Sequence, residues 1–376
     1  MVYVSVNFFN MRYSLIVAVI SLVSAVVCDG RSVIQTDGKY DYIVSVPDVH
    51  GDLEILIRSL WMAKSAIDKS ENVLIDSFHK SVVDAMGKDD FLSTSSSHFT
   101  SRVLLVQTGD IVDRGPASLS CYKALWAAAR DVLKWDLVNL FGNHEVMSMA
   151  GQADHYAHPD DIKEFGSLGA RRNEFSVGGK LWKKLTSEFQ FMLKVVVGNE
   201  KVLFVHAGIA PHYMKAVQKK FSDKADDLVV SLNEFLLNEV VKNPSSDYLT
   251  SAQSPIWTRD MAQGSDKQIC KNMLPAVMRM MDVTRIVVGH TPQETLVTGN
   301  RCGGHLLLAD VAMSRWMGSG HNGNPSVVVF NLSNNGNKLD KIVNMYWKGE
   351  VVGTNGRVAE DVLVQTSDES GENPEL

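Results

Sequence analysis

The chain has 376 residues, of which 45% are hydrophobic and 21% are charged, a composition typical of a globular protein with a sizeable core. Its formal net charge of −6 provides no basic field for DNA or RNA, and no cluster of lysines and arginines offsets that charge locally. We therefore expect no nucleic-acid partner.

The N-terminal residues have the pattern of a secretory signal peptide. Arg12 precedes an apolar run, Leu15 to Cys28, that two serines interrupt. The run is shorter than the roughly 20 residues that a membrane-spanning helix needs. We therefore predict a signal peptide over residues 1–28, cleaved after Ala25 or Cys28, and no stable membrane span after cleavage. The predicted location is the secretory pathway, either the ER lumen or outside the cell, and an uncleaved membrane anchor is the alternative.

The cysteines do not form a disulfide-rich framework. The chain contains four of them, Cys28, Cys121, Cys270 and Cys302. If cleavage follows Cys28, at least one of the remaining three is unpaired within the chain, and no C-x-x-C spacing indicates a structural zinc site or a redox motif. The stretch Asn331-Leu332-Ser333 is an N-glycosylation acceptor, which is consistent with export.

Five short apolar runs end abruptly in polar residues. In chain order they are Tyr42–Val46, Val103–Val106, Leu137–Phe141, Val202–Val205 and Ile286–Val288. Runs of β-branched and aliphatic residues that close on a turn residue are typical of strands buried on both faces. We therefore predict five buried strands.

Helical patterns lie between the first of these runs. Apolar residues recur at helical spacing from Leu53 to Trp61 and again from Leu74 to Met86. Strands that alternate with helices indicate an α/β fold with a sheet covered on both faces, in which ligands bind beyond the carboxyl ends of the strands. Polar residues that follow the predicted strands are therefore the candidates for a functional site.

Six residues at these strand ends carry oxygen or imidazole nitrogen that can bind a metal ion. They are Asp48, His50, Asp110, Asn143, His206 and His290. The set offers no thiolate, so it suits Mn, Fe, Zn or Mg. Six ligands are too many for one ion with an open position, but they suit two ions, roughly 3.5–4 Å apart, that share a carboxylate. Taken singly, each residue could equally be a helix cap or a structural histidine.

Neighbouring residues could bind and protonate a phosphate ester. The planar guanidinium groups of Arg114 and Arg259 can each grip two phosphate oxygens. His144 could protonate the leaving oxygen, and Asp113 could hold its imidazole in position. A surface ion pair is the alternative interpretation of Arg259.

These stretches resemble the five ordered motifs of the PPP-type, calcineurin-like metallophosphatases. They are Asp48-Val49-His50-Gly51, Gly109–Gly115, Gly142-Asn143-His144-Glu145, His206-Ala207-Gly208 and Gly289-His290, and their order and spacing hold from about Asp41 to Phe330. Further stretches are similar to the Shewanella-like protein phosphatase branch: Glu145-Val146-Met147, Tyr156-x-His158-Pro159, Arg171-Arg172-x-x-Phe175 and Asp310-Val311-Ala312-Met313-Ser314.

The resemblance implies the calcineurin-like metallophosphoesterase fold of the α/β class, a central β-sandwich flanked by helices, with a catalytic domain over residues 41–348. Two divalent ions (Mn, Fe or Zn) are implied. The implied ligands of the first ion are Asp48, His50 and Asp110, and those of the second are Asp110, Asn143, His206 and His290. The implied phosphate-binding residues are Arg114, Arg259 and Asn143, and the implied acid pair is His144 with Asp113. The mostly polar and acidic residues 353–376 are predicted to form a flexible tail.

Three departures from the family pattern stand out. Pro47 takes the place of a glycine before the first ligand, and Ala207 that of a glycine after His206. The segment around Arg259 lacks the Ser-Asp-Pro of the eukaryotic Ser/Thr enzymes. The first two leave the ligands intact, and the third leaves open the preference between Ser/Thr and Tyr.

The expected activity is hydrolysis of Ser/Thr or Tyr phosphomonoesters of phosphoproteins, by water that two metal ions activate. A calcineurin-like hydrolase of a small-molecule phosphoester or a dinucleoside polyphosphate shares every ligand and is the alternative. A catalytically inactive binding module is not favoured, because no ligand and neither member of the acid pair is missing.

Overall fold

The computed structural model describes residues 32–68, 74–88, 101–221, 227–293, 295, 297–318, 323–348 and 357–366. The predicted signal peptide over residues 1–28 lies outside these ranges. Within them, no helix combines the length and the apolar character that crossing a membrane requires.

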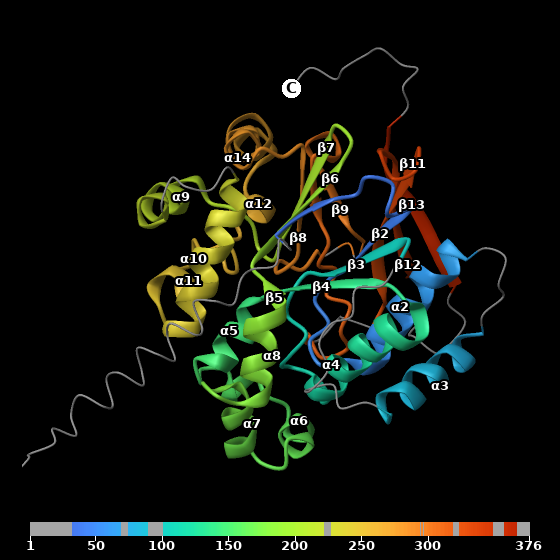
Figure 1. The fold of residues 1–376 in the computed structure, drawn as a ribbon, viewed down its shortest axis with the longest axis vertical. Helices are drawn as coiled ribbons and strands as arrows, with labels where there is room; N and C mark the ends of the chain where they lie inside the picture. Colours follow the sequence, from blue (N-terminus) through green and yellow to red (C-terminus); the bar gives the residue numbers. More distant parts are fainter. Residues whose placement is uncertain are drawn as a thin grey trace, which may run out of the picture.

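The strands form two sheets (Figure 1). The first has the order β13-β12-β11-β2-β3-β4-β5, with β2 to β5 parallel and β11, β12 and β13 added in antiparallel order. Its strands are β2 (Tyr42–Val46), β3 (Val103–Gln107), β4 (Asp136–Leu140), β5 (Phe189–Gln190), β11 (Ser326–Ser333), β12 (Lys338–Lys348) and β13 (Arg357–Gln365). The second has the order β1-β6-β7-β8-β10-β9, with β7, β8 and β10 parallel. Its strands are β1 (Val33–Gln35), β6 (Met192–Val197), β7 (Glu200–Val205), β8 (Arg285–Val288), β9 (Gly299–Arg301) and β10 (Leu306–Leu308).

The space between the sheets explains why the predicted strands are continuously apolar. Ile43 of β2 belongs to the same apolar cluster as Phe204 of β7, and Phe204 meets Phe330 of the other sheet with ring centroids 5.5 Å apart. The next residue along β2, Val44, faces the opposite side and packs in a second cluster with the helices. The predicted strands and the implied sandwich are confirmed. However, a second sheet, not a layer of helices, covers one face of each sheet.

Helices cover the outer faces of the sandwich (Figure 1). On the side of the seven-stranded sheet lie α2 (Leu53–Ile67), α3 (Ile75–Met86) and α4 (Ser118–Ala127). On the other side lie α9 (Pro211–Val217), α10 (Leu228–Lys242), α11 (Asp247–Thr250), α12 (Asp260–Gln263), α13 (Asp266–Gln268) and α14 (Leu274–Met281). The two helical patterns of the sequence correspond to α2 and α3.

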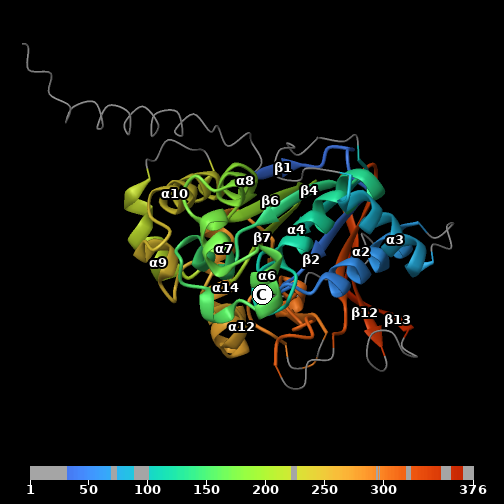
Figure 2. The ribbon, with the colours of Figure 1, turned by 90° about the horizontal axis from the view of Figure 1, so that it is seen from below.

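A further helical group lies at the lower end of the molecule in Figure 1, and Figure 2 shows it from below. It comprises α5 (Asn143–Met149), α6 (Pro159–Glu164), α7 (Leu168–Phe175) and α8 (Lys180–Glu188). Short 3-10 or π segments extend or connect the helices: η1 (Ala128–Leu133), η2 (Asp154–Tyr156), η3 (Gln218–Lys220), η4 (Ile269–Met273) and η5 (Cys302–Gly304). Along the chain this group connects β4 to β5 of the seven-stranded sheet, and β5 leads directly into β6 of the other sheet.

The loop after β2 is tied to the segment after β10. Asp52 is the N-cap of α2, where one of its carboxylate oxygens accepts a hydrogen bond from the main-chain N–H of Ile55 at 3.4 Å. The same carboxylate accepts from the guanidinium and the main-chain N–H of Arg315 at 2.6 to 2.9 Å. Segments far apart in the sequence are thereby fixed at one edge of the sandwich, beyond the carboxyl ends of β2, β3, β4, β7 and β8.

The prediction of a flexible tail over residues 353–376 is wrong for Arg357–Gln365. Arg357–Gln365 forms β13, which pairs antiparallel with β12 along its whole length. The ladder satisfies the main-chain groups of β13, so this stretch of mixed apolar and polar residues adds as an edge strand without a fully buried residue, and Val362 is 58% exposed. Apart from Thr366, the rest of the predicted tail lies outside the described residues.

A disulfide joins Cys270 of η4 to Cys302 of η5, and Cys121 is a buried free thiol. The two linked cysteines are 32 positions apart in the sequence. The closed loop contains all of β8 and His290, one of the predicted ligands. A cross-link of this kind reduces the conformational entropy of the unfolded chain.

Replacing both linked cysteines, Cys270→Ser with Cys302→Ser, should therefore lower the free energy of unfolding by roughly 3–4 kcal/mol, the loop-closure value for a ring of this length. Urea denaturation measures the change. Reductant should destabilise the wild-type protein by a similar amount and leave the double variant unaffected. A wild-type protein that does not respond to reductant would contradict the expectation.

Candidate metal centre

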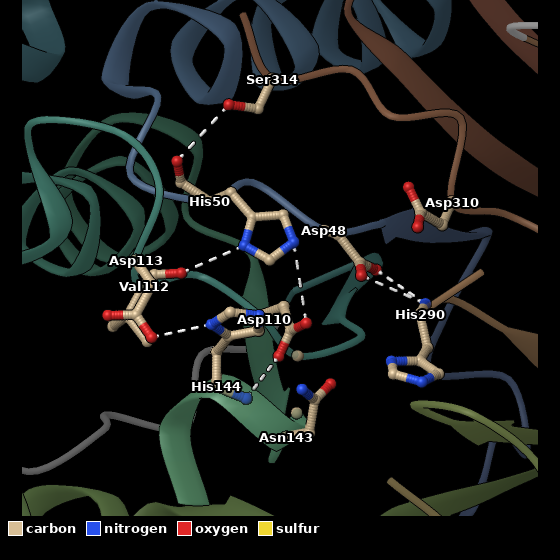
Figure 3. Close-up of polar contacts among 12 residues, drawn as sticks. Asp48, His50, Asp110, Val112, Asp113, Asn143, His144, His290, Asp310 and Ser314 are labelled. Carbon is tan, nitrogen blue, oxygen red and sulfur yellow. Dashed lines mark hydrogen bonds and ion pairs between the residues drawn. The ribbon is translucent and has the colours of Figure 1, made fainter. Parts of the chain in front are cut away.

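The structure brings all six predicted ligands together at the edge where the strands end (Figure 3). His50 and Asp110 belong to one group of potential metal-binding side chains, and Asp110, His206 and His290 belong to another, each with ligand atoms within 4.8 Å of one another. Asp110 is common to both groups. The six side chains come from residues that are between 0% and 5% exposed, so the centre is withdrawn from bulk water.

Each of the three histidines is oriented by a main-chain carbonyl. Nδ1 of His50 lies 3.2 Å from the carbonyl oxygen of Val112, and Nδ1 of His206 lies 2.8 Å from that of Thr108. For His290 it is Nε2 that lies 3.0 Å from the oxygen of Trp257. A carbonyl accepts only from N–H, so in the neutral tautomer the second ring nitrogen keeps its lone pair for a metal ion.

The carboxylates are held by main-chain N–H groups. Asp48 accepts from the N–H of His290 at 3.1 and 3.3 Å, and Asp110 accepts from that of His144 at 2.9 Å. The second oxygen of Asp110 lies 3.4 Å from Nε2 of His206 and 3.7 Å from Nε2 of His50. The same Nε2 of His206 lies 3.1 Å from the side-chain oxygen of Asn143. Asp110 is therefore positioned between the two histidine groups.

Glu145 fixes the loops that carry these ligands. Its carboxylate accepts hydrogen bonds from the main-chain N–H groups of Asp110, Ile111 and Gly142 at 2.8 to 2.9 Å. The approach is so close that a Cβ on Gly142 would collide with the main chain and carboxylate of Asp110. Only glycine fits there, which ties the third motif to the second.

The backbone itself is strained at the centre. His50, Asp110 and His290 have left-handed φ angles of 47°, 55° and 65°, and Asp113 and Arg114 have 68° and 66°. Non-glycine residues rarely adopt this region, and when they do they concentrate at functional sites. The turn back after each strand is what aims these side chains at a common point.

Burial and mutual charge shift the pKa values of these groups. Burial and the negative charge of Asp310 raise the pKa of Asp48 well above its usual range. Burial lowers the pKa of His50 to about 3 and, together with His206, that of His290 to about 2. Burial lowers the pKa of His206, but the charge and the hydrogen bond of Asp110 outweigh burial and raise this pKa to about 10. The carboxylate of Asp110 therefore favours a positive charge at this position.

The predicted acid pair and the predicted phosphate-binding arginines lie beside the predicted metal ligands. Nδ1 of His144 lies 2.7 Å from Oδ2 of Asp113, and both side chains are buried. The guanidinium of Arg114 lies over the ring of Tyr156, 5.4 Å from its centroid, and its Nε is buried without a hydrogen-bond partner among the described residues. Arg259 donates to the main-chain oxygen of His290 at 3.0 Å. Both arginines are partly exposed, in contrast to the six predicted ligands.

The position of His144 suits two roles, that of a metal ligand and that of a proton donor. His144 lies close enough to His50 and Asp110 to be grouped with them as a potential ligand. A carboxylate on its Nδ1 leaves Nε2 directed away from Asp113, which suits a proton donor as well as a ligand. The metal content of a His144 variant distinguishes the two.

Sequence reasoning missed Asp310 as a member of this cluster, although the residue was part of a family-like stretch. Asp310 follows β10, is 1% exposed, and lies beside Asp48 and His290 in Figure 3. One of its oxygens accepts from the N–H of Ala312 at 2.8 Å, and the other is buried without a partner in the described part of the chain. Burial raises its pKa to about 6. The signal was present, since the short apolar run Leu306–Leu308 also ends in a carboxylate.

The donor set fits divalent metal ions. It consists of carboxylate and amide oxygens and imidazole nitrogens, in two groups that share one carboxylate, with the histidines oriented by carbonyls. Fold and site together define a candidate centre for divalent metal ions.

Comparison with known proteins identifies the family. The family model of the calcineurin-like phosphoesterases matches residues 43–294, and the chain belongs to this family. It is thus a metal-dependent hydrolase that acts on phosphoesters.

The chain is also similar to two relatives and to a solved structure. An uncharacterized protein of Schizosaccharomyces pombe is 29% identical over 252 residues, which cover 66% of this chain and 70% of the relative. Shewanella-like protein phosphatase 1 of Plasmodium berghei is 25% identical over 289 residues, covering 75% and 68%. The crystal structure of a cold-active protein-tyrosine phosphatase from a Shewanella species superposes with a TM-score of 0.57 at 18% identity, covering 89% of this chain and 82% of that one. This last likeness confirms the predicted fold.

Replacing the shared carboxylate, Asp110→Asn, should remove metal from the protein and abolish turnover, because one side chain serves both groups of ligands. Asparagine tolerates the left-handed backbone as aspartate does, so the loop conformation should persist. Metal content by elemental analysis and kcat on an aryl phosphate measure the two effects. A variant that keeps near-normal kcat would place the shared ligand elsewhere.

Proposed function

We propose that the protein is a metal-dependent phosphoprotein phosphatase that hydrolyses Ser/Thr or Tyr phosphomonoesters with two divalent ions, Mn, Fe or Zn. The observation that carries the proposal is the pair of ligand groups sharing Asp110. A phosphoprotein substrate is favoured by the relative named Shewanella-like protein phosphatase 1, which matches 75% of this chain.

When bound, the two ions would polarise the phosphoryl group and activate a water molecule as the nucleophile. The first ion would be held by Asp48, His50 and Asp110, and the second by Asp110, Asn143, His206 and His290. The chain itself supplies the remaining contacts. Arg259 donates to the main-chain oxygen of His290, and Arg114 directly follows Asp113 of the acid pair, so the two guanidinium groups would bind the phosphate from the sides of these residues.

The acid pair would complete the reaction. Asp113 accepts from Nδ1 of His144, so the imidazole has its Nε2 available to give a proton to the leaving oxygen. Because both residues are buried, the tautomer is fixed by this one contact and not by bulk water.

A hydrolase of dinucleoside polyphosphates remains the alternative, because it would use the same ligands. Turnover of phosphoserine, phosphothreonine and phosphotyrosine peptides should exceed that of a diadenosine polyphosphate at equal enzyme and metal concentrations. Chelation should abolish the activity, and added Mn should restore it, because every ligand atom is oxygen or nitrogen. Preferential cleavage of the dinucleotide would favour the alternative, and full activity in a metal-free preparation would refute the metal-dependent mechanism.

Export through the secretory pathway is a second part of the proposal. The Cys270–Cys302 disulfide supports it, since such bonds persist mainly in oxidising compartments. The acceptor Asn331 lies at the end of β11 and is partly exposed.

N-terminal sequencing of the protein from its native cells should give a mature terminus at Val26 or Asp29, the positions after the two predicted cleavage sites. The cytosolic fraction of the same cells is the control. An intact Met1 or Met11 on cytosolic protein would contradict export and leave the chemistry of the site unaffected.

A further inference from the structure

Arg171 is a buried cation that has no role in the functions described so far. It lies on α7, is 2% exposed, and contacts two fully buried carboxylates. Its Nη2 donates to Oδ1 of Asp113 at 2.5 Å, and its Nε donates to Oδ2 of Asp161 at 2.9 Å. The guanidinium also lies over the ring of Phe175, 5.1 Å from the centroid. A single planar cation therefore bridges two buried anions, which the point charge of a lysine cannot do in the same geometry.

The contact with Asp113 bears directly on the acid pair. Oδ1 of Asp113 is held by Arg171 while Oδ2 lies 2.7 Å from Nδ1 of His144, and the main-chain N–H of Asp113 donates to the hydroxyl of Ser118 at 3.1 Å. With each oxygen on a different partner, the carboxylate is not free to rotate about its Cβ–Cγ bond. The plane of the imidazole is fixed as a result.

Asp161, the second carboxylate that Arg171 contacts, is bound to the N-terminus of α4. Oδ1 of Asp161 accepts from the main-chain N–H of Ser118, the first residue of α4, at 2.9 Å. Glu164, on the same helix α6 as Asp161, accepts from the N–H groups of Leu119 and Ser120 at 2.9 Å. Carboxylates at the start of a helix satisfy its unpaired N–H groups, so α6 is fastened to the N-terminus of α4.

We propose that Arg171 is a positioning residue for the proton transfer: it holds Asp113 so that His144 faces the leaving group of the phosphate ester. The inference rests on the proposed acid role of His144. The oxygen of water would bond to phosphorus on the side opposite the ester oxygen. As the ester P–O bond breaks, its electron pair goes to the leaving oxygen, which takes the proton of His144 Nε2, and the proton that the water gives up restores the imidazolium. The products are the alcohol or phenol and inorganic phosphate.

The leaving group provides the test. An ester of a strongly acidic phenol, p-nitrophenyl phosphate, departs with little need for a proton, whereas phenyl phosphate departs with a basic oxygen that needs one. Four variants are compared on both substrates: Arg171→Met, Arg171→Lys, His144→Asn as the reference for a lost acid, and Arg172→Met as the matched control. Arg172 is the next residue on α7, but it is exposed and pairs with Asp154 at the surface.

His144→Asn should keep its metal and lower kcat on phenyl phosphate by roughly 10²–10⁴-fold, the range for general acid catalysis. Arg171→Met should lower the same kcat by about 10–100-fold, as expected when a catalytic group is misplaced. Its kcat on p-nitrophenyl phosphate should fall far less, with KM and metal content unchanged. Arg172→Met should match the wild type on both substrates. In the His144→Asn background, Arg171→Met should cause no further loss.

Arg171→Lys keeps the charge but cannot contact both carboxylates, so it should show the same substrate dependence with a smaller loss. If Arg171→Met does not fold, the comparison of Arg171→Lys with the wild type on the two substrates is sufficient for the test. Equal losses on the two substrates, or additive losses in the His144→Asn background, would overturn the role of Arg171. If His144→Asn itself lacks the substrate dependence, the acid role fails and the positioning role fails with it. If only the Arg171 variants lack the substrate dependence, the acid role of His144 is retained and the positioning role of Arg171 is refuted.

Discussion

The arrangement of the centre depends on the carboxylate of Glu145. Three main-chain N–H groups from two loops, those of Asp110, Ile111 and Gly142, converge on its two oxygens. Because Glu145 is itself on α5, the helix that begins with Asn143, one side chain sets the distance between the loop after β3 and the loop after β4. Leaving the buried carboxylate of Glu145 without these hydrogen bonds would cost free energy. The hydrogen bonds therefore hold the two loops in a fixed position relative to each other.

The electrostatics follow from this constraint. Several carboxylates and imidazoles are gathered in a space from which water is largely excluded, and the pKa of Asp48 and of Asp310 rises because each is buried near another negative charge. Isolated buried anions are unfavourable unless cations or hydrogen bonds balance them. Arg171 balances the charge at the acid pair, whereas the carboxylates of Asp48 and Asp310 accept hydrogen bonds from main-chain N–H groups. The excess of acceptors at the ligands is what makes a divalent cation stabilising there.

Much of this could be predicted from the sequence, since buried strands that end in metal-binding residues are recognisable locally. Asp48, Asp110 and His290 were found in this way, and their roles as ligands stay predictions until metal is measured. The division of the strands between two sheets followed from family resemblance alone, because an apolar strand does not indicate what covers each face. Arg171 could not be assigned, because its contact with Asp113 joins residues 58 positions apart through the packing of α7. The strand β13 was missed because its apolar residues do not alternate regularly and lie within a mostly polar and acidic segment.

The Cys270–Cys302 bond has a topological consequence. It closes a covalent ring that includes β8 and His290, so this predicted ligand is attached to the rest of the chain by two routes. A single proteolytic nick anywhere inside the ring would open it without separating the fragments. The two fragments would stay joined through the disulfide, so neither β8 nor His290 would be lost from the molecule.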